Sequence, residues 1–254
     1  MSNHSKPDDT PFFIGWASPP EGLRLFLISF AASALLFGGF AAYLIASTQN
    51  DPGNGAFVGR ANAIGVMTTL PYPILHVTES QRFAEGTALI LSGGGKIGVQ
   101  DRANPLDGQM VRAAGARIAR GDLTGLQLRG GQNGLRAETD AAPVTLERTS
   151  LGTWRMTGEI CDGKCLAGAM RPGRGLAHKA CANLCLIGGV PAVFVSSGPV
   201  DGTEFFLVAD ENGNPIPDSF YDYTAIFIEA EGEIEKLGTL KIFKIREDSI
   251  KVIR

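Results

Sequence analysis

The longest apolar run of the chain lies near its beginning. From Leu23 to Ser47 the residues read LRLFLISFAASALLFGGFAAYLIAS, and Arg24 is the only charge among them. A helix needs about 20 apolar residues to cross a hydrocarbon core, whereas a cleaved signal peptide has a shorter apolar region and a small-residue cleavage site. We predict an uncleaved transmembrane helix over residues 23–47. Cleavage after Ala46 or Ser47 stays open as the alternative.

The cations that flank this run predict its orientation. Lys6 and Arg24 lie on its N-terminal side, and the first cation after it is Arg60. Positive residues favour the cytoplasmic side. We therefore expect a short cytoplasmic segment at 1–22, a linker at 48–59, and the rest of the chain outside the cytoplasm. The predicted location is a bacterial-type cytoplasmic membrane, crossed once, with the C-terminal part in the periplasm.

After the linker the apolar residues alternate with polar ones, and the pattern occurs twice. The stretch MVRAAGARIARGDLTGLQL parallels FIEAEGEIEKLGTLKIFKI, and both have the period of two that is typical of strands. Glycines at matching intervals support an internal repeat. The matching pairs are Gly86 with Gly202, Gly115 with Gly232, and Gly121 with Gly238.

Short strands, a glycine within a strand and a hairpin return are features of small Greek-key barrels. In these features each copy resembles an OB-type barrel. The predicted fold is therefore mainly β: one transmembrane helix and two tandem OB-like domains, at residues 60–148 and 150–254. The second copy is longer, because 44 residues separate Gly158 from Gly202 but only 21 separate Gly65 from Gly86. We place this insertion at about 161–190.

The insertion contains all four cysteines of the chain. They are arranged as Cys161-x3-Cys165 and Cys181-x3-Cys185, and His178 precedes the second pair by three residues. A short helix through HKACANLCLIGG puts His178, Cys181 and Cys185 on one face. We take these five residues as candidate metal ligands, for Zn, Cu or an iron–sulfur cluster.

Three interpretations of the cysteines remain open. An oxidising compartment permits two structural disulfides, and four cysteines allow three connectivities. A metal site uses the same thiols together with His178. A reversible dithiol pair is the third, although Cys-x2-Cys is its stronger signature. The cofactor is therefore unknown from the sequence.

Charge and motifs exclude several functions. The chain has 23 Lys and Arg against 26 Asp and Glu, a net charge of −3, which argues against a nucleic-acid partner. Residues 92–96, SGGGK, lack the flanking residues of a phosphate-binding loop and predict a turn. The glutamates at 229, 231, 233 and 235 predict a solvated strand face. We find no catalytic constellation and favour a binding role over an enzyme.

The function predicted from the sequence is an accessory or binding subunit of a membrane-associated redox or metal-handling system. Its insertion would hold a metal or serve as a docking loop, and its partners would be the membrane and other membrane or periplasmic proteins. The alternative is a structural or assembly protein with two disulfides and no cofactor.

Overall fold

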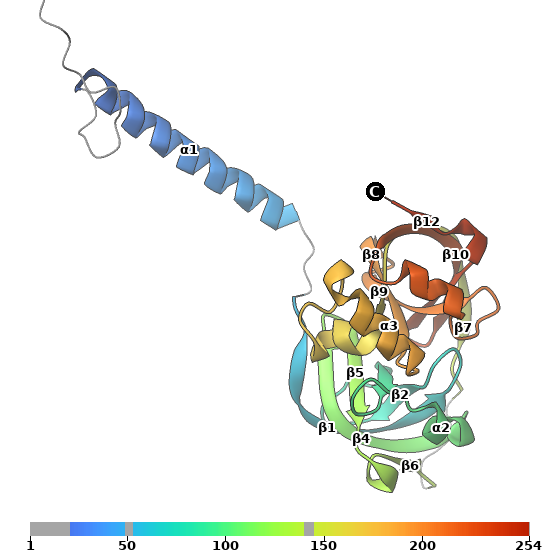
Figure 1. Ribbon diagram of the computed structural model, residues 1–254. Coiled ribbons are helices and arrows are strands. Elements are labelled where there is room, and N and C mark those ends of the chain that lie inside the picture. The colour runs from blue at the N-terminus through green and yellow to red at the C-terminus, as the bar shows by residue number, and fades with distance from the viewer. Residues whose placement is uncertain (1–20, 49–52, 140–144, 254) are drawn as a thin grey trace, which may run out of the picture. The chain divides into compact units, whose positions relative to one another are not determined.

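The structure is a computed structural model that describes residues 21–48, 53–139 and 145–253. Contacts divide the chain into two units, Met1–Asp51 and Pro52–Arg254. The first contains one described helix, and the second contains the strands (Figure 1). Most of the predicted cytoplasmic segment, residues 1–20, and residues 49–52 of the predicted linker lie outside the described residues.

Helix α1, Glu21–Thr48, includes the predicted apolar span. Its stretch Gly22–Ile45 contains 24 residues. At 1.5 Å per residue this is about 36 Å, more than the ~30 Å of a bilayer core. The prediction of one apolar N-terminal helix, long enough to span a membrane or to act as a signal sequence, is confirmed. The side of the membrane on which the rest of the chain lies stays a prediction.

The second unit is mainly β and contains two six-stranded sheets. The first sheet consists of β1 (Ala56–Thr68), β2 (Ile74–Glu79), β3 (Ala88–Ser92), β4 (Met110–Arg120), β5 (Leu123–Leu128) and β6 (Leu135–Ala137). The second consists of β7 (Arg148–Asp162), β8 (Ala192–Val200), β9 (Thr203–Asp210), β10 (Phe227–Leu237), β11 (Leu240–Ile245) and β12 (Lys251–Val252).

Strand pairing follows the same plan in both sheets. β1 pairs with β2 and also with β4, and β7 pairs with β8 and also with β10. The only parallel pairs among the named strands are β3 with β5 and β9 with β11. In each sheet the pairings of five strands therefore return to the first strand, in the order β1-β2-β3-β5-β4 and β7-β8-β9-β11-β10.

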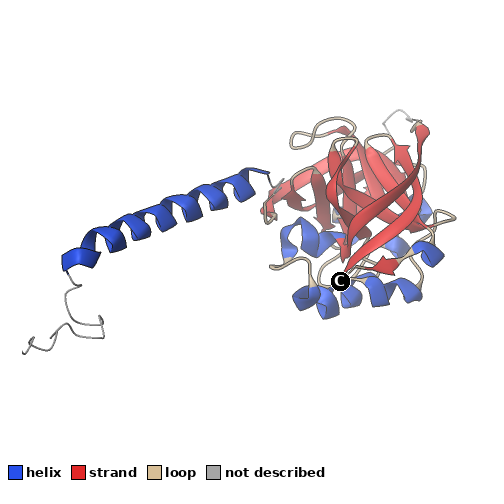
Figure 2. Cartoon of the chain, turned by 90° about the horizontal axis from the view of Figure 1, so that it is seen from above, coloured by secondary structure: helices blue, strands red, loops and turns tan. Residues whose placement is uncertain are grey.

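Short helices connect the strands. They are α2 at Gln100–Ala103 and the 3-10 helices η1 (Asn104–Leu106), η2 (Gly131–Asn133), η5 (Asp218–Tyr223) and η6 (Glu247–Ser249). Three more, η3, η4 and α3, lie between β7 and β8. In Figure 2 the helices of this unit gather along one side of the strands.

The repeated glycines occupy equivalent positions in the two sheets. Gly115 on β4 and Gly232 on β10 both lie where the partner strand crosses closely. A Cβ atom at Gly115 would overlap the carbonyl oxygen of Gln127, and one at Gly232 would overlap that of Lys244. Gly86 and Gly202 have φ values of 81° and 83° before β3 and β9. The two halves therefore repeat one arrangement, as the glycine spacing predicts.

The two sheets share a hydrophobic core. Its largest cluster combines Ile74, Ile90 and Ile118 of the first sheet with Phe194 and Phe206 of the second. Each of these side chains is at most 5% exposed. Fully burying such a side chain contributes about 1.5–3 kcal/mol, so the shared cluster stabilises both sheets together.

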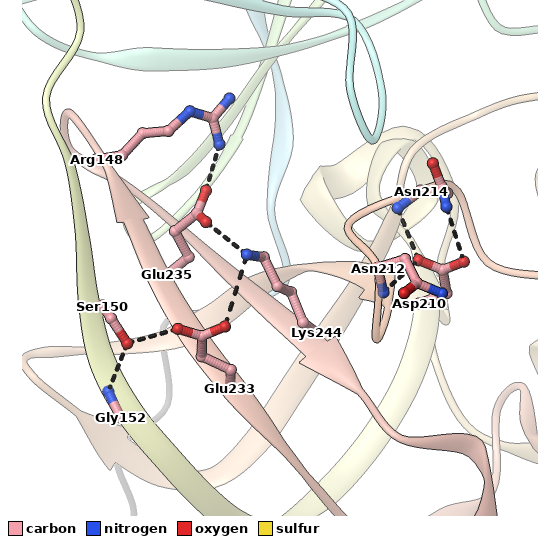
Figure 3. A network of polar contacts seen from close by, with 9 residues as sticks. All are labelled: Arg148, Ser150, Gly152, Asp210, Asn212, Asn214, Glu233, Glu235 and Lys244. Atoms are coloured by element: carbon pink, nitrogen blue, oxygen red, sulfur yellow. Dashed lines mark hydrogen bonds and ion pairs between the residues drawn. The ribbon is translucent and has the colours of Figure 1, made fainter.

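The glutamates of β10 lie on its outer face, as the alternation predicts, and they form ion pairs there. Glu235 pairs with Arg148 of β7 and with Lys244 of β11 (Figure 3). Glu233 accepts a hydrogen bond from the Ser150 hydroxyl at 2.5 Å. The acidic row therefore links three neighbouring strands, although exposed pairs of this kind contribute only about 0–1 kcal/mol each.

His76 on β2 makes the stability of this unit sensitive to pH. The ring is 3% exposed, and its Nε2 hydrogen-bonds to Thr68 Oγ1 at 3.0 Å. Nδ1 has no hydrogen-bond partner among the described residues. Burial, with a smaller contribution from Arg148, lowers the pKa of His76 from 6.5 to about 4. The folded protein therefore favours the neutral ring.

Because the unfolded chain binds the proton more tightly, His76 contributes its full stability above pH 6.5 and loses it as the pH falls towards 4. Between pH 7 and pH 5 the free energy of unfolding should fall by about 2 kcal/mol on this account. Chemical unfolding of the full chain in detergent, at both pH values, measures this. His76→Gln should remove that part of the pH dependence, and an unchanged dependence would contradict the assignment.

Candidate metal centre

The insertion replaces a short connection. In the first sheet β1 ends at Thr68 and β2 begins at Ile74, whereas β7 ends at Asp162 and β8 begins only at Ala192. The intervening residues form η3 (Cys165–Ala169, a π-helical turn), η4 (Leu176–His178) and α3 (Lys179–Ile187). The predicted helix is present as α3, which ends at Ile187 with Gly188 as its C-cap, whereas His178 belongs to the 3-10 helix before it.

Three of the four cysteines and the histidine lie on these three elements, whereas Cys161 lies on β7. Cys165 begins η3, where its backbone N–H donates to Asp162 Oδ1 at 2.8 Å. His178 ends η4, and Cys181 and Cys185 follow on α3. His178 and Cys185 face the interior at 3% and 1% exposure, and Cys181 is half-buried.

These donors converge in two overlapping groups. Cys165, His178 and Cys181 each offer one ligand atom, and all three atoms lie within 4.8 Å of one another. Asp162, Cys165 and Cys185 form a second group by the same measure. Cys165 belongs to both groups, so its sulfur connects them. Thiolate and imidazole donors at such spacing are the ligands that Zn²⁺ prefers.

Cys161 belongs to neither group. Its thiol is fully buried and donates to Glu159 Oε1 at 3.0 Å. Burial, together with the nearby Glu159, raises the pKa of Cys161 well above its usual value. The side chain therefore stays a neutral thiol, and the structure brings together four of the five predicted ligands rather than all five.

Asp162 contacts the histidine of the cluster. Its Oδ2 lies 3.0 Å from His178 Nε2, and both side chains are almost completely buried. A carboxylate on one ring nitrogen fixes the imidazole orientation and leaves the other nitrogen to face a metal. Asp162 is not among the ligands predicted from the sequence. Its position directly after Cys161 was the available signal.

Two lysines approach the thiols. Lys96 Nζ donates to Cys181 Sγ at 2.6 Å and lies 4.0 Å from Cys185 Sγ. The hydrogen bond to Cys181 raises the pKa of Lys96, so its amine stays protonated. Lys164 is 4% exposed, and burial lowers the pKa of its amine. Positive charge beside a thiol favours the thiolate, the form that binds metals.

Cys165 and Cys185 are joined by a hydrogen bond between their thiols. Their sulfurs are 3.9 Å apart. The hydrogen bond between them raises the pKa of the Cys165 thiol and lowers that of Cys185. In the absence of a metal, Cys185 is therefore the more acidic member of the pair.

All four cysteines are free thiols in the structure. The 3.9 Å between the Cys165 and Cys185 sulfurs is well beyond the bonded S–S distance of about 2.05 Å. The described residues therefore offer no bonded pair in support of the two-disulfide interpretation.

Lys96 reaches the cluster because a turn of the first sheet docks on the insertion. We call residues 93–98 the glycine turn. Lys164 Nζ donates to the carbonyl oxygens of Gly93 and Gly95, each at 2.7 Å. Gly98 N donates to the Gly188 oxygen at 2.7 Å, at the end of α3. The sequence correctly predicted a turn here, but no pattern within it indicated a contact with residues about 90 positions away.

Comparison with protein-family models, with curated protein sequences and with solved structures found no match for this chain. The geometry of the cluster is therefore the basis for the proposals that follow.

Proposed function

We propose that this chain is a membrane-anchored, extracytoplasmic binding subunit whose insertion holds a transition-metal ion. The observation that carries the proposal is that Cys165 belongs to two donor groups, and that the ligand atoms within each group lie within 4.8 Å of one another. The proposed ligands are Cys165, His178, Cys181 and Cys185, and Asp162 orients the histidine. We place the subunit in a redox or metal-handling system with other membrane or periplasmic proteins as partners.

Each sheet of the second unit is proposed to be a small OB-like barrel. In support, five strands in each half pair in a ring that returns to the first strand, and each ring contains one parallel pair, β3 with β5 in the first half and β9 with β11 in the second. A partly open five-stranded barrel of this kind is a common scaffold for binding loops. The insertion lies between the first two strands of the second ring.

Zinc is the ion that these donors favour. Three thiolates and one imidazole form a Cys3His set, which is typical of closed tetrahedral zinc sites. Three thiolates around a divalent ion leave one net negative charge, and Lys96 and Lys164 lie close enough to offset it. The buried Asp162 adds the carboxylate support that metal-bound histidines commonly receive.

Elemental analysis of the full chain, purified in detergent without chelators, tests the proposal. We expect about one zinc ion per chain, as a closed four-ligand site requires. Thiol titration with a chromogenic disulfide should detect more reactive thiols after a strong chelator is added, without any reductant. Absence of metal contradicts the proposal. If titratable thiols are absent as well, the two-disulfide assembly protein becomes the better description.

A further inference from the structure

The insertion presents an apolar helix face to the outside. Leu176, Leu184 and Ile187 are 72%, 55% and 62% exposed. Ala177 and Ala180 are also exposed, and together these residues follow a helical spacing along one side of η4 and α3. The opposite side carries His178, Cys181 and Cys185. One helix therefore contributes one face to the candidate metal centre and leaves the other without polar side chains.

The apolar face continues onto the glycine turn. Ile97 is 61% exposed, and the hydrogen bond from Gly98 N to the Gly188 oxygen holds it beside the end of α3. Met170, at the start of the loop before η4, is 46% exposed. Exposed large apolar side chains that gather on one side of a protein are typical of interaction sites. We call Ile97, Leu176, Leu184 and Ile187 the apolar ridge.

Basic residues accompany the apolar ridge. The segment 163–200 contains no Asp or Glu, although the whole chain has a net charge of −3. Of the two lysines in this segment, Lys164 is buried, and Lys179 donates to the Asp222 carbonyl oxygen at 2.6 Å. Arg171 and Arg174 are exposed in the loop before η4. Apolar side chains combined with Lys and Arg, and without acids, are the features of helices that lie in a membrane interface.

The insertion also lies beside the chain that leads from the apolar helix. Arg171 donates to the Gly55 carbonyl oxygen at 3.0 Å. Gly55 and Gly168 pack so closely that a Cβ atom at either would overlap the backbone of the other segment. Gly55 follows Thr48, the last residue of α1, by seven positions. Seven residues span at most about 25 Å. A membrane that holds α1 is therefore within reach of the insertion.

We propose that the apolar ridge docks on the surface of the lipid bilayer, with the arginines of the loop on anionic headgroups. The inference rests on the membrane anchor of the proposed function but not on the metal. Two features favour a lipid surface over a protein partner. The absence of acidic residues from 163–200 suits anionic headgroups, and the short connection to α1 keeps the insertion near the membrane. Docking would hold the candidate metal centre close to the membrane.

Fluorescence quenching tests this in the full chain, reconstituted in vesicles that contain anionic phospholipids with brominated acyl chains. In a Trp16→Phe, Trp154→Phe background, Leu184→Trp places a single reporter on the apolar ridge. An interfacial apolar face is buried about 5–10 Å, so we expect it to lose more than about half of its emission. The matched control is Leu70→Trp, an equally exposed position at the other end of β1, which should keep its emission.

A third reporter separates failure of the docking from failure of the anchor. Phe37→Trp lies within α1 and should be quenched whenever the helix is in the bilayer. Quenching of the tryptophan at position 37 without quenching at position 184 would overturn the docking and leave the anchor in place. Absence of quenching at both positions would overturn the anchor and the docking together. Arg174→Gln, or vesicles without anionic lipid, should weaken quenching at 184 only, and equal quenching in all cases would contradict the role of charge.

Discussion

Cys165→Ser is expected to abolish metal retention. Cys165 is the one ligand common to both donor groups, so its loss leaves no group of three. Loss of an outer-shell partner of a metal site already costs about 10–100-fold in affinity, and loss of the central thiolate should exceed about 100-fold. The measurement is the zinc content of the full chain after dialysis against a buffered weak chelator.

Cys161→Ser is the matched control for this variant. It removes a buried thiol from the preceding strand that belongs to neither donor group. Zinc content should be preserved, although the buried hydroxyl is expected to lower stability modestly. Asp162→Asn should give an intermediate loss, because it weakens the support of His178 without removing a ligand. Equal zinc content in the Cys165 and Cys161 variants would contradict the assigned ligands.

Gly115→Ala is expected to destabilise the second unit strongly. An added Cβ would overlap the Gln127 carbonyl oxygen in the neighbouring strand, and backbone cannot move aside as a flexible side chain does. The expected loss is about 3 kcal/mol or more in the free energy of unfolding. Chemical denaturation of the full chain in detergent measures it, through the midpoint and slope of the transition.

Gly232→Ala should have a similar effect, because Gly232 has the equivalent position against Lys244. Gly198→Ala serves as the control: it lies on β8, where an added Cβ meets nothing within 4 Å. That variant should differ from the parent by less than about 1 kcal/mol. If Gly115→Ala and Gly198→Ala have the same stability, the close crossing of β4 and β5 is not the reason for the repeated glycine.

The parts of the fold that the sequence predicts are those set by local pattern. The apolar run over 23–47 is sufficient for α1, and period-two alternation with a glycine at the hairpin is sufficient for β10 and β11. Because the sequence pattern occurs twice, the strand predicted around Gly115 and the strand predicted around Gly232 support each other. β1 begins at Ala56, within the segment 48–59 that the sequence predicts as a linker.

The candidate site was predictable only in part, because its remaining members come together through tertiary packing. Helical spacing groups His178, Cys181 and Cys185. No spacing predicts that Cys165 joins them, since η3 departs from helical geometry at Gly168, where φ is 125°. Lys96 is a stronger example, because its approach to Cys181 depends on how two sheets far apart in the sequence pack together.

The docked glycine turn has a consequence for how the two halves could have diverged. After a duplication, either half can drift only while the contacts between them are kept. Lys96 of the first half donates to Cys181 of the second half. Lys164 of the second half donates to the carbonyl oxygens of Gly93 and Gly95 of the first half. Each copy has become part of the other's folding environment. A chain built from two first halves or from two second halves would lack the partners of these hydrogen bonds. The two copies are therefore no longer interchangeable.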